Sequence, residues 1–140
     1  MFSTRKVSIS RSATMVAVSF DIFFQRFDGT AADATEVMAV LEPYVVRQDD
    51  RYVRVALEDG EADVYLSDPS AGAMVNHASG RAVWDLMYDL AVAGRFAVLP
   101  VGCGTCVPVA AMAAELPDYV PEPIRVVASG EDLLAAVSAS

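Results

Sequence analysis

A predicted β-hairpin around the dipeptide Asp59-Gly60 constrains the fold more than any other feature of the sequence. Asp-Gly favours a two-residue type I′ turn, and residues 52–58 and 61–67 flank it with alternating apolar and polar side chains. A two-residue loop fixes the register and sets three apolar pairs on one face: Leu57 opposite Ala62, Val55 opposite Val64 and Val53 opposite Leu66. The other face then carries a polar cluster of Arg54, Asp63 and Tyr65.

Hydrophobic periodicity predicts a strand and a helix before this hairpin. Residues 16–25 alternate with period 2, which predicts one strand that ends before Asp28-Gly29. Thr30 and Asp33 resemble a capping box at the start of a helix. Its apolar residues recur at helical spacing up to Leu41, and Pro43 stops it.

After the hairpin, a loop at residues 68–72 precedes a second helix. Ser79 is its predicted N-cap, Arg81 and Asp85 are spaced to pair along it, and Gly94 suits its C-terminus. The apolar run at residues 96–101 is typical of a strand covered on both faces. The remaining predicted elements are a short helix at 107–116, a strand at 124–128 and a final helix at 131–137 capped by Ser129.

This order of elements predicts an α+β fold. Its first six elements match a ferredoxin-like βαββαβ core, to which residues 124–137 add a C-terminal βα extension. We expect an antiparallel or mixed sheet with the helices on one face. In that topology the strand at 96–101 lies at an edge, where apolar strands invite aggregation. We therefore expect the strand at 124–128 to pair beside it, although a homodimer contact would protect the edge equally well.

The chain has 140 residues, which is enough for one domain with a substantial core. Residues 1–14 contain Arg5, Lys6 and Arg11 but no acid, and we predict a disordered basic leader there, followed by a single domain at 15–140. The alternative is a secretory signal with its apolar region at residues 13–20, but that region is short and runs straight into Asp21. We therefore expect a cytoplasmic protein.

The net charge and the lack of a long apolar run exclude two classes of partner. The whole chain carries a net charge of −9 and the leader +3, so the remaining 126 residues carry −12. A nucleic-acid-binding domain needs a basic surface, so we expect no nucleic acid as partner. No apolar run approaches the roughly 20 residues that span a bilayer, so we expect no membrane partner either.

Cys103 and Cys106 form a C-x-x-C pair with three interpretations. Between a strand and a helix N-terminus they resemble a thiol redox centre, because a helix N-terminus lowers the pKa of a thiol. With His77 they supply only three of the four ligands of a typical structural zinc site. The third interpretation, which we favour, is two buried thiols without chemistry. Accordingly, we expect no catalytic residue, metal or cofactor.

His77 follows Asn76 in the loop before the second helix. Its imidazole suits acid–base chemistry in principle. Because no nucleophile motif accompanies it, we interpret Asn76 and Ser79 as residues that organise the loop and cap the helix.

The best candidate for a binding surface is a set of acids on and beside the hairpin. A basic protein would be steered toward such a surface, whereas an ordinary solvated hairpin with charges that discourage edge pairing is the alternative. The candidate residues are Asp49, Asp50, Glu58, Asp59, Glu61, Asp63 and Asp68.

Several short segments resemble a group of small uncharacterised bacterial proteins. The likeness begins with the strand Val18-Ser19-Phe20-Asp21-Ile22-Phe23-Phe24-Gln25-Arg26-Phe27. It continues in Met74-Val75-Asn76-His77, Ala82-Val83-Trp84-Asp85-Leu86, Leu99-Pro100-Val101-Gly102 and Ser129-Gly130-Glu131-Asp132-Leu133-Leu134. These proteins look like members of a broad class of small acidic proteins that includes immunity partners of bacterial toxins. Together with small size, strong acidity and the lack of a catalytic constellation, this resemblance favours a non-enzymatic binding protein, most concretely an immunity protein that neutralises a toxin through an acidic surface. Thiol redox or metal-dependent catalysis at Cys103 and Cys106 is the alternative.

Overall fold

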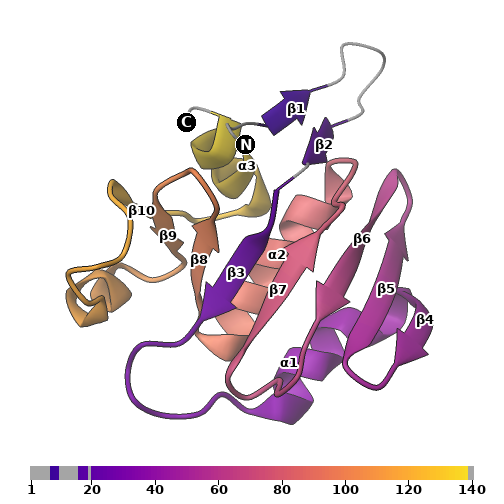
Figure 1. The fold of residues 1–140 in the computed structure, drawn as a ribbon, viewed down its shortest axis with the longest axis horizontal. Helices are drawn as coiled ribbons and strands as arrows, with labels where there is room; N and C mark the ends of the chain where they lie inside the picture. Colours follow the sequence, from indigo (N-terminus) through magenta and orange to yellow (C-terminus); the bar gives the residue numbers. More distant parts are fainter. Residues whose placement is uncertain (1–6, 10–15, 19, 139–140) are drawn as a thin grey trace.

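A computed structural model describes residues 7–9, 16–18 and 20–138. The fold is α+β, with an eight-stranded mixed sheet and three α-helices on one of its faces (Figure 1). The helical elements are α1 (Ala34–Leu41), α2 (Ala82–Gly94) and α3 (Gly130–Ser138), with 3₁₀ turns η1 (Glu42–Tyr44) and η2 (Ala110–Glu115). The strands are β1 (Val7–Ile9), β2 (Val16–Val18), β3 (Ile22–Gln25), β4 (Val45–Asp49), β5 (Tyr52–Leu57), β6 (Gly60–Tyr65), β7 (Gly72–Asn76), β8 (Ala97–Pro100), β9 (Thr105–Val107) and β10 (Ile124–Val126).

The large sheet has the strand order β10-β9-β8-β3-β7-β6-β5-β4. Neighbouring strands are antiparallel except β9 and β10, which are parallel, so the predicted α+β class and mixed sheet are confirmed. The predicted βαββαβ core is not observed in its simple form. Three strands that the sequence did not suggest, β4, β7 and β9, join the sheet, and β7 lies between β3 and β6.

The apolar strand β8 is an interior strand of the sheet. The sequence predicted that residues 124–128 would pair beside it, and this prediction is wrong. β9 follows β8 through a tight turn and pairs with it, and β10 lies one place further out. The predicted helix at residues 107–116 begins later and is the 3₁₀ turn η2.

The single strand predicted at residues 16–25 is wrong as well. β2 and β3 are separate strands in different sheets, since β2 pairs only with β1 in a two-stranded antiparallel sheet. Residues 7–9 of the predicted disordered leader form β1, and the rest of the leader lies outside the described residues.

The main core lies between the large sheet and the three helices. Alternate residues of β3, β5 and β6 face the helices, and α2 packs across the middle of the layer between α1 and α3 (Figure 1). Trp84 and Phe96 are the largest of the fully buried side chains. Truncating a buried aromatic residue to alanine typically costs about 3–5 kcal/mol. The three helices cover one face of the large sheet and leave the opposite face, the open face, uncovered.

A small second core covers one end of the open sheet face. Ala97 and Val107 point away from the helices and are buried under Met112 of η2, with Leu99 and Phe27 packed around them. This cover explains why most of the apolar run at residues 96–101 is shielded on both sides, whereas Val101 at its end is exposed. Over β5 and β6, the open face carries Tyr52, Arg54, Asp63 and Tyr65, and Met74 of β7 lies opposite Tyr65.

The hairpin of β5 and β6 is present with a register shifted by two residues. Leu57 pairs with Gly60, Val55 with Ala62 and Val53 with Val64, so the turn is Glu58-Asp59 rather than Asp59-Gly60. Because side chains alternate with period 2, a shift of two residues leaves every side chain on its predicted face.

Gly60 is required at this position for close packing rather than for the turn. A Cβ on Gly60 would overlap the backbone carbonyl of Ser79, which lies against the start of β6. The Ser79 N–H donates to the Glu61 carbonyl, and the Ser79 hydroxyl accepts from the Glu61 N–H. The glycine that suggested the turn thus allows the loop before α2 to approach the hairpin.

Both predicted ends of α2 differ in the structure. The N-terminal N–H groups of Arg81 and Ala82 donate to the Asp59 carboxylate, so a residue from the hairpin caps the helix in place of Ser79. Arg95, with φ of 52°, is the left-handed C-cap in place of Gly94. Gly94 is the last residue of α2, where a Cβ would overlap the Phe96 ring. The cap by Asp59 ties the hairpin tip to α2.

Candidate functional site

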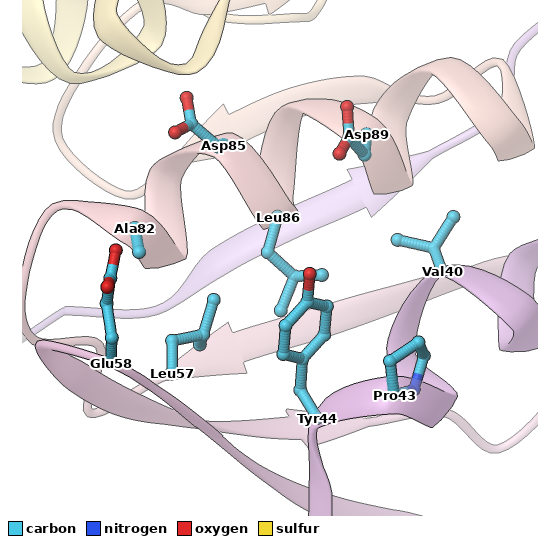
Figure 2. Close-up of a pocket in the computed structure, with 9 residues that line it drawn as sticks. All are labelled: Val40, Pro43, Tyr44, Leu57, Glu58, Ala82, Asp85, Leu86 and Asp89. Carbon is cyan, nitrogen blue, oxygen red and sulfur yellow. The ribbon is translucent and has the colours of Figure 1, made fainter.

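A groove on the helical side of the molecule lies between α1, η1, the hairpin tip and α2 (Figure 2). Its volume of about 480 Å³ is within the range of about 300–1,000 Å³ that ligand sites occupy. Figure 2 shows Leu86 of α2 pointing toward the Tyr44 ring from η1. The groove is lined by Val40, Pro43, Tyr44, Leu57, Glu58, Ala82, Asp85, Leu86 and Asp89.

The floor and sides of the groove are apolar. Leu86 is buried in the main core, whereas Val40 and Leu57 are partly buried at its margin. The Tyr44 side chain stands at the mouth and is 39% exposed. These residues meet because Pro43 ends α1 and turns the chain through η1 into β4, alongside the end of β5. The sequence therefore builds an apolar surface that remains accessible.

Three carboxylates border this apolar surface, and no basic side chain among the described residues lines it. Asp85 and Asp89 come from successive turns of α2, and Glu58 comes from the hairpin turn. Throughout the described residues, none of these three carboxylates makes a hydrogen bond or an ion pair, and the predicted pairing of Arg81 with Asp85 is absent. Figure 2 shows the Asp85 and Asp89 carboxylates pointing to the side of α2 away from Leu86 and Tyr44, so the negative charge lies along the rim of the apolar groove.

The surroundings of Asp89 in the groove disfavour the ionised form of its carboxyl group. Burial, and next the nearby charge of Asp85, raise the pKa of Asp89 above its ordinary value of 3.8. A cation at the groove would oppose both effects, because it would favour the ionised carboxylate. The three acids do not form a metal site, since no set of three His, Cys, Asp or Glu side chains in the described part of the chain is placed to hold a metal ion.

Six of the seven acids predicted from the sequence lie at the two ends of the β4–β5–β6 ribbon, and Asp63 lies between them opposite Arg54. Asp49 and Asp50 are at the β4–β5 turn, and Asp68 follows β6 at the same end. Glu58, Asp59 and Glu61 are at the opposite end, and a six-residue strand such as β5 is about 20 Å long. Glu58 is the predicted acid that lines the groove.

Several of the predicted acids are engaged within the fold. The Asp59 carboxylate caps α2, and the Asp68 carboxylate accepts from the N–H and the hydroxyl of Ser70. The Glu61 carboxylate lies 2.6 Å from Arg54, and the exposed pair of Asp49 with Arg47 is 3.7 Å apart. The sequence alone did not identify Asp85 and Asp89, and their i, i+4 spacing on the outer face of α2 was the available signal.

Asp63 is the centre of the polar cluster predicted on the open sheet face. Its Oδ1 atom accepts from the Tyr52 hydroxyl and from Arg54 Nη1, each at 2.5 Å, and its Oδ2 atom lies 2.8 Å from His77 Nδ1. Burial opposes ionisation, but the hydrogen bonds from Tyr52, His77 and Arg54 outweigh it and hold the pKa of Asp63 below its ordinary value of 3.8. The hydrogen bond to Asp63 raises the pKa of Tyr52.

His77 belongs to this cluster rather than to a cysteine site. It adopts a left-handed backbone conformation with φ of 54°, and its side chain is 69% exposed. Such a conformation is uncommon for a residue other than glycine, although histidine is one of the more tolerant residues. Because its Nδ1 atom lies within hydrogen-bond distance of Asp63, His77 is a surface member of this polar cluster.

The C-x-x-C pair lacks the geometry of a redox centre. Cys106 lies in β9, so a strand follows the pair where the redox interpretation required a helix N-terminus. Cys106 is 3% exposed, and burial raises the pKa of its thiol to about 11. A thiol with this pKa is almost entirely protonated near neutral pH, which makes it a poor nucleophile. Cys103 is half-buried, and its thiol lies 3.9 Å from the Val137 carbonyl oxygen.

Comparisons with known proteins identify no relative. No family model, no curated protein and no solved structure matches the chain. Within residues 7–9, 16–18 and 20–138, no helix is both long enough and apolar enough to cross a membrane. The chemistry of the acidic groove is therefore the basis for assigning a function.

Proposed function

We propose that this protein is a non-enzymatic binding protein whose acidic groove receives a basic segment of a partner protein. One observation carries the proposal: Glu58, Asp85 and Asp89 border an accessible apolar groove, and no cation of residues 7–9, 16–18 or 20–138 forms an ion pair with them. Burying unpaired carboxylates against an apolar partner would be costly. A partner that presents both apolar and basic side chains gains contact area and compensates the charge.

The charge of the whole chain supports the same type of partner. The net charge of −9 creates a negative potential that attracts basic proteins and accelerates their association. Steering of this kind weakens at high ionic strength because salt screens it. We therefore expect association with the partner to slow markedly between low and physiological salt.

The specific role that we propose is that of an immunity-type protein, which neutralises a bacterial toxin by occupying a basic surface of it in the cytoplasm. Small size, strong acidity and the resemblance of several segments to small acidic bacterial proteins support this role. A homodimer is compatible with this role when its interface leaves the groove of each copy open.

Affinity capture of proteins from the source organism tests the proposal. The bait is the tagged chain, compared with the variant Glu58→Gln/Asp85→Asn/Asp89→Asn. The matched control, Asp49→Asn/Asp50→Asn/Asp118→Asn, removes the same number of exposed charges away from the groove. We expect a basic protein that the wild-type chain and the control capture and the groove variant loses. Capture of the same proteins by the groove variant would contradict the proposal.

The immunity role has its own test. The captured partner is expressed in bacterial cells with and without this chain, and growth is measured. We expect the partner alone to arrest growth and the wild-type chain to restore it, whereas the groove variant restores it poorly. A partner that is harmless when expressed alone would refute the immunity role and leave the binding function standing.

A further inference from the structure

We infer that the segment received by the groove is a basic amphipathic α-helix that lies along α2. The inference rests on the proposed function and adds the conformation and side-chain pattern of the partner. Three features of the groove carry it: the saturated backbone of its walls, the spacing of its carboxylates and the position of its apolar side chains.

The backbone around the groove offers little to an extended peptide. The long walls are α1 and α2, whose interior N–H and C=O groups are already bonded along each helix. An extended peptide would lose water from its own polar backbone groups without gaining partners from these walls, at a considerable free-energy cost. A helix satisfies its own backbone, so it can enter an apolar groove without this cost.

The carboxylates lie in a row along α2. Asp85 and Asp89 are one helical turn apart, which corresponds to about 6 Å along the axis. Glu58 lies beneath Ala82 at the beginning of α2 (Figure 2). From Ala82 to Asp89 the axial distance is about 10 Å, or two turns. A partner helix with Lys or Arg on successive turns therefore meets the row of carboxylates at matching intervals.

Apolar side chains lie beside this row of charges. Leu86 projects from α2 toward Tyr44 on the side of the groove, and Val40 lies at the far end (Figure 2). An amphipathic helix places a leucine stripe next to its basic stripe, so leucines can pack against these residues while the basic groups reach the carboxylates. The methylene stems of Lys and Arg would cover the intervening apolar surface.

A set of synthetic peptides tests this inference on the 140-residue chain. The probe is an alanine-rich peptide of about 18 residues, long enough to form a helix. Leucines lie on one of its faces, and lysines four residues apart flank them. One control has the same composition in an order without an amphipathic face. The second control keeps the order but has a central proline, which breaks the helix and leaves the charge unchanged.

Fluorescence anisotropy of labelled peptides at 0.15 M salt gives the dissociation constants. We expect the helical probe to bind about tenfold more tightly than either control peptide. Asp85→Asn/Asp89→Asn should weaken binding of the probe about fivefold to tenfold, because two exposed ion pairs are lost. Tyr44→Ala, at an exposed position outside the core, should weaken it severalfold. The matched variant Asp49→Asn/Asp50→Asn should change binding less than about twofold.

Two results would overturn the inference. One is equal binding of the helical and proline-containing probes, which would indicate an extended or disordered basic segment, or a small cation, as the occupant. The other is an equal loss of probe affinity in Asp85→Asn/Asp89→Asn and in Asp49→Asn/Asp50→Asn, which would indicate general charge attraction without a binding site. Capture of a native partner that depends on Glu58, Asp85 and Asp89 would in either case preserve the proposed function. If the peptides show no preference for the helical probe and capture of a native partner does not depend on Glu58, Asp85 and Asp89, both the proposed function and the helical occupant are refuted.

Discussion

The two faces of the large sheet use carboxylates in opposite ways. On the open face, Asp63 is largely buried and receives hydrogen bonds from Tyr52 and Arg54, with His77 beside it. On the helical face, Asp85 and Asp89 border an apolar groove, and neither carboxylate pairs with a side chain of the described part of the chain. Acids that the fold has already paired stabilise it, whereas acids that it leaves unpaired are free to bind another molecule. Stability and binding should therefore respond to different substitutions.

Removing the carboxylate of Asp63 should have the largest effect on stability. Asp63→Asn leaves Arg54 in a partly buried position with one acid fewer and weakens three hydrogen bonds. We expect a loss of about 2–3 kcal/mol in the free energy of unfolding, because a buried charge that loses its partner is costly. Urea denaturation of the purified chain measures this effect. An Asn substitution at Asp63 that leaves the midpoint unchanged would show that the cluster is not structural.

The cap that Asp59 provides for α2 should have the next largest effect. Asp59→Ala exposes the N–H groups of Arg81 and Ala82, and N-cap removal typically costs about 1 kcal/mol. The neighbouring variant Glu58→Ala is the control, since the Glu58 carboxylate makes no such bond. Thermal denaturation should separate the two variants, and equal midpoints would contradict the assignment of the cap.

The stabilities contributed by Asp63 and Asp89 should change in opposite directions with pH. The pKa of Asp63 is lowered in the folded chain, so its contribution to stability is present above its ordinary value of 3.8 and is lost as the pH falls through the lower folded value. The pKa of Asp89 is raised, so the stability that it contributes is present below 3.8 and is lost as the pH rises through the higher folded value. Unfolding midpoints of wild type, Asp63→Asn and Asp89→Asn between about pH 2 and 6 measure both contributions.

The wild-type curve should fall more steeply toward acid pH than that of Asp63→Asn. In contrast, the unfolding midpoint of Asp89→Asn should decrease less than that of wild type as the pH rises just above 3.8. Parallel curves for all three proteins would mean that neither group is coupled to folding in the way that its surroundings indicate.

The same contrast explains what the sequence predicts well. Hydrophobic periodicity is a local property, and it correctly assigned α1, α2, α3 and the hairpin, together with the faces of Val53 and Arg54. It even placed Asp63 on the correct face despite an error of two residues in register, because an even shift preserves alternation.

What the sequence could not give depends on contacts between distant segments. Gly60 suggested a turn residue, but its role is to admit the Ser79 backbone, 19 residues away. Asp59 caps a helix that begins 23 residues later. The groove is equally non-local, since Tyr44, Glu58 and Asp85 meet only when η1, the hairpin and α2 are assembled. The local sequence pattern therefore indicated that acidic residues form the candidate binding surface, but it could not show which of them lack a partner within the fold.

The smallest predicted effect on stability concerns the groove acids themselves. Asp85 and Asp89 are like charges at i, i+4 spacing on α2, an arrangement that costs about 0.2–0.5 kcal/mol on a helix. Asp89→Asn removes this repulsion and the burial of a charge, so we expect stability to be unchanged or to rise by about 0.3 kcal/mol. Urea denaturation at neutral pH and low salt measures this change, and added salt should reduce it.

The variants Asp63→Asn and Asp89→Asn form a matched pair, because each replaces one aspartate by its neutral isostere. If Asp89→Asn instead destabilised the chain as much as Asp63→Asn, the groove would be a structural ion site with a partner inside the fold. A gain or no change in stability, combined with loss of binding, would mean that the chain maintains an electrostatic cost at the groove that only a cationic partner relieves.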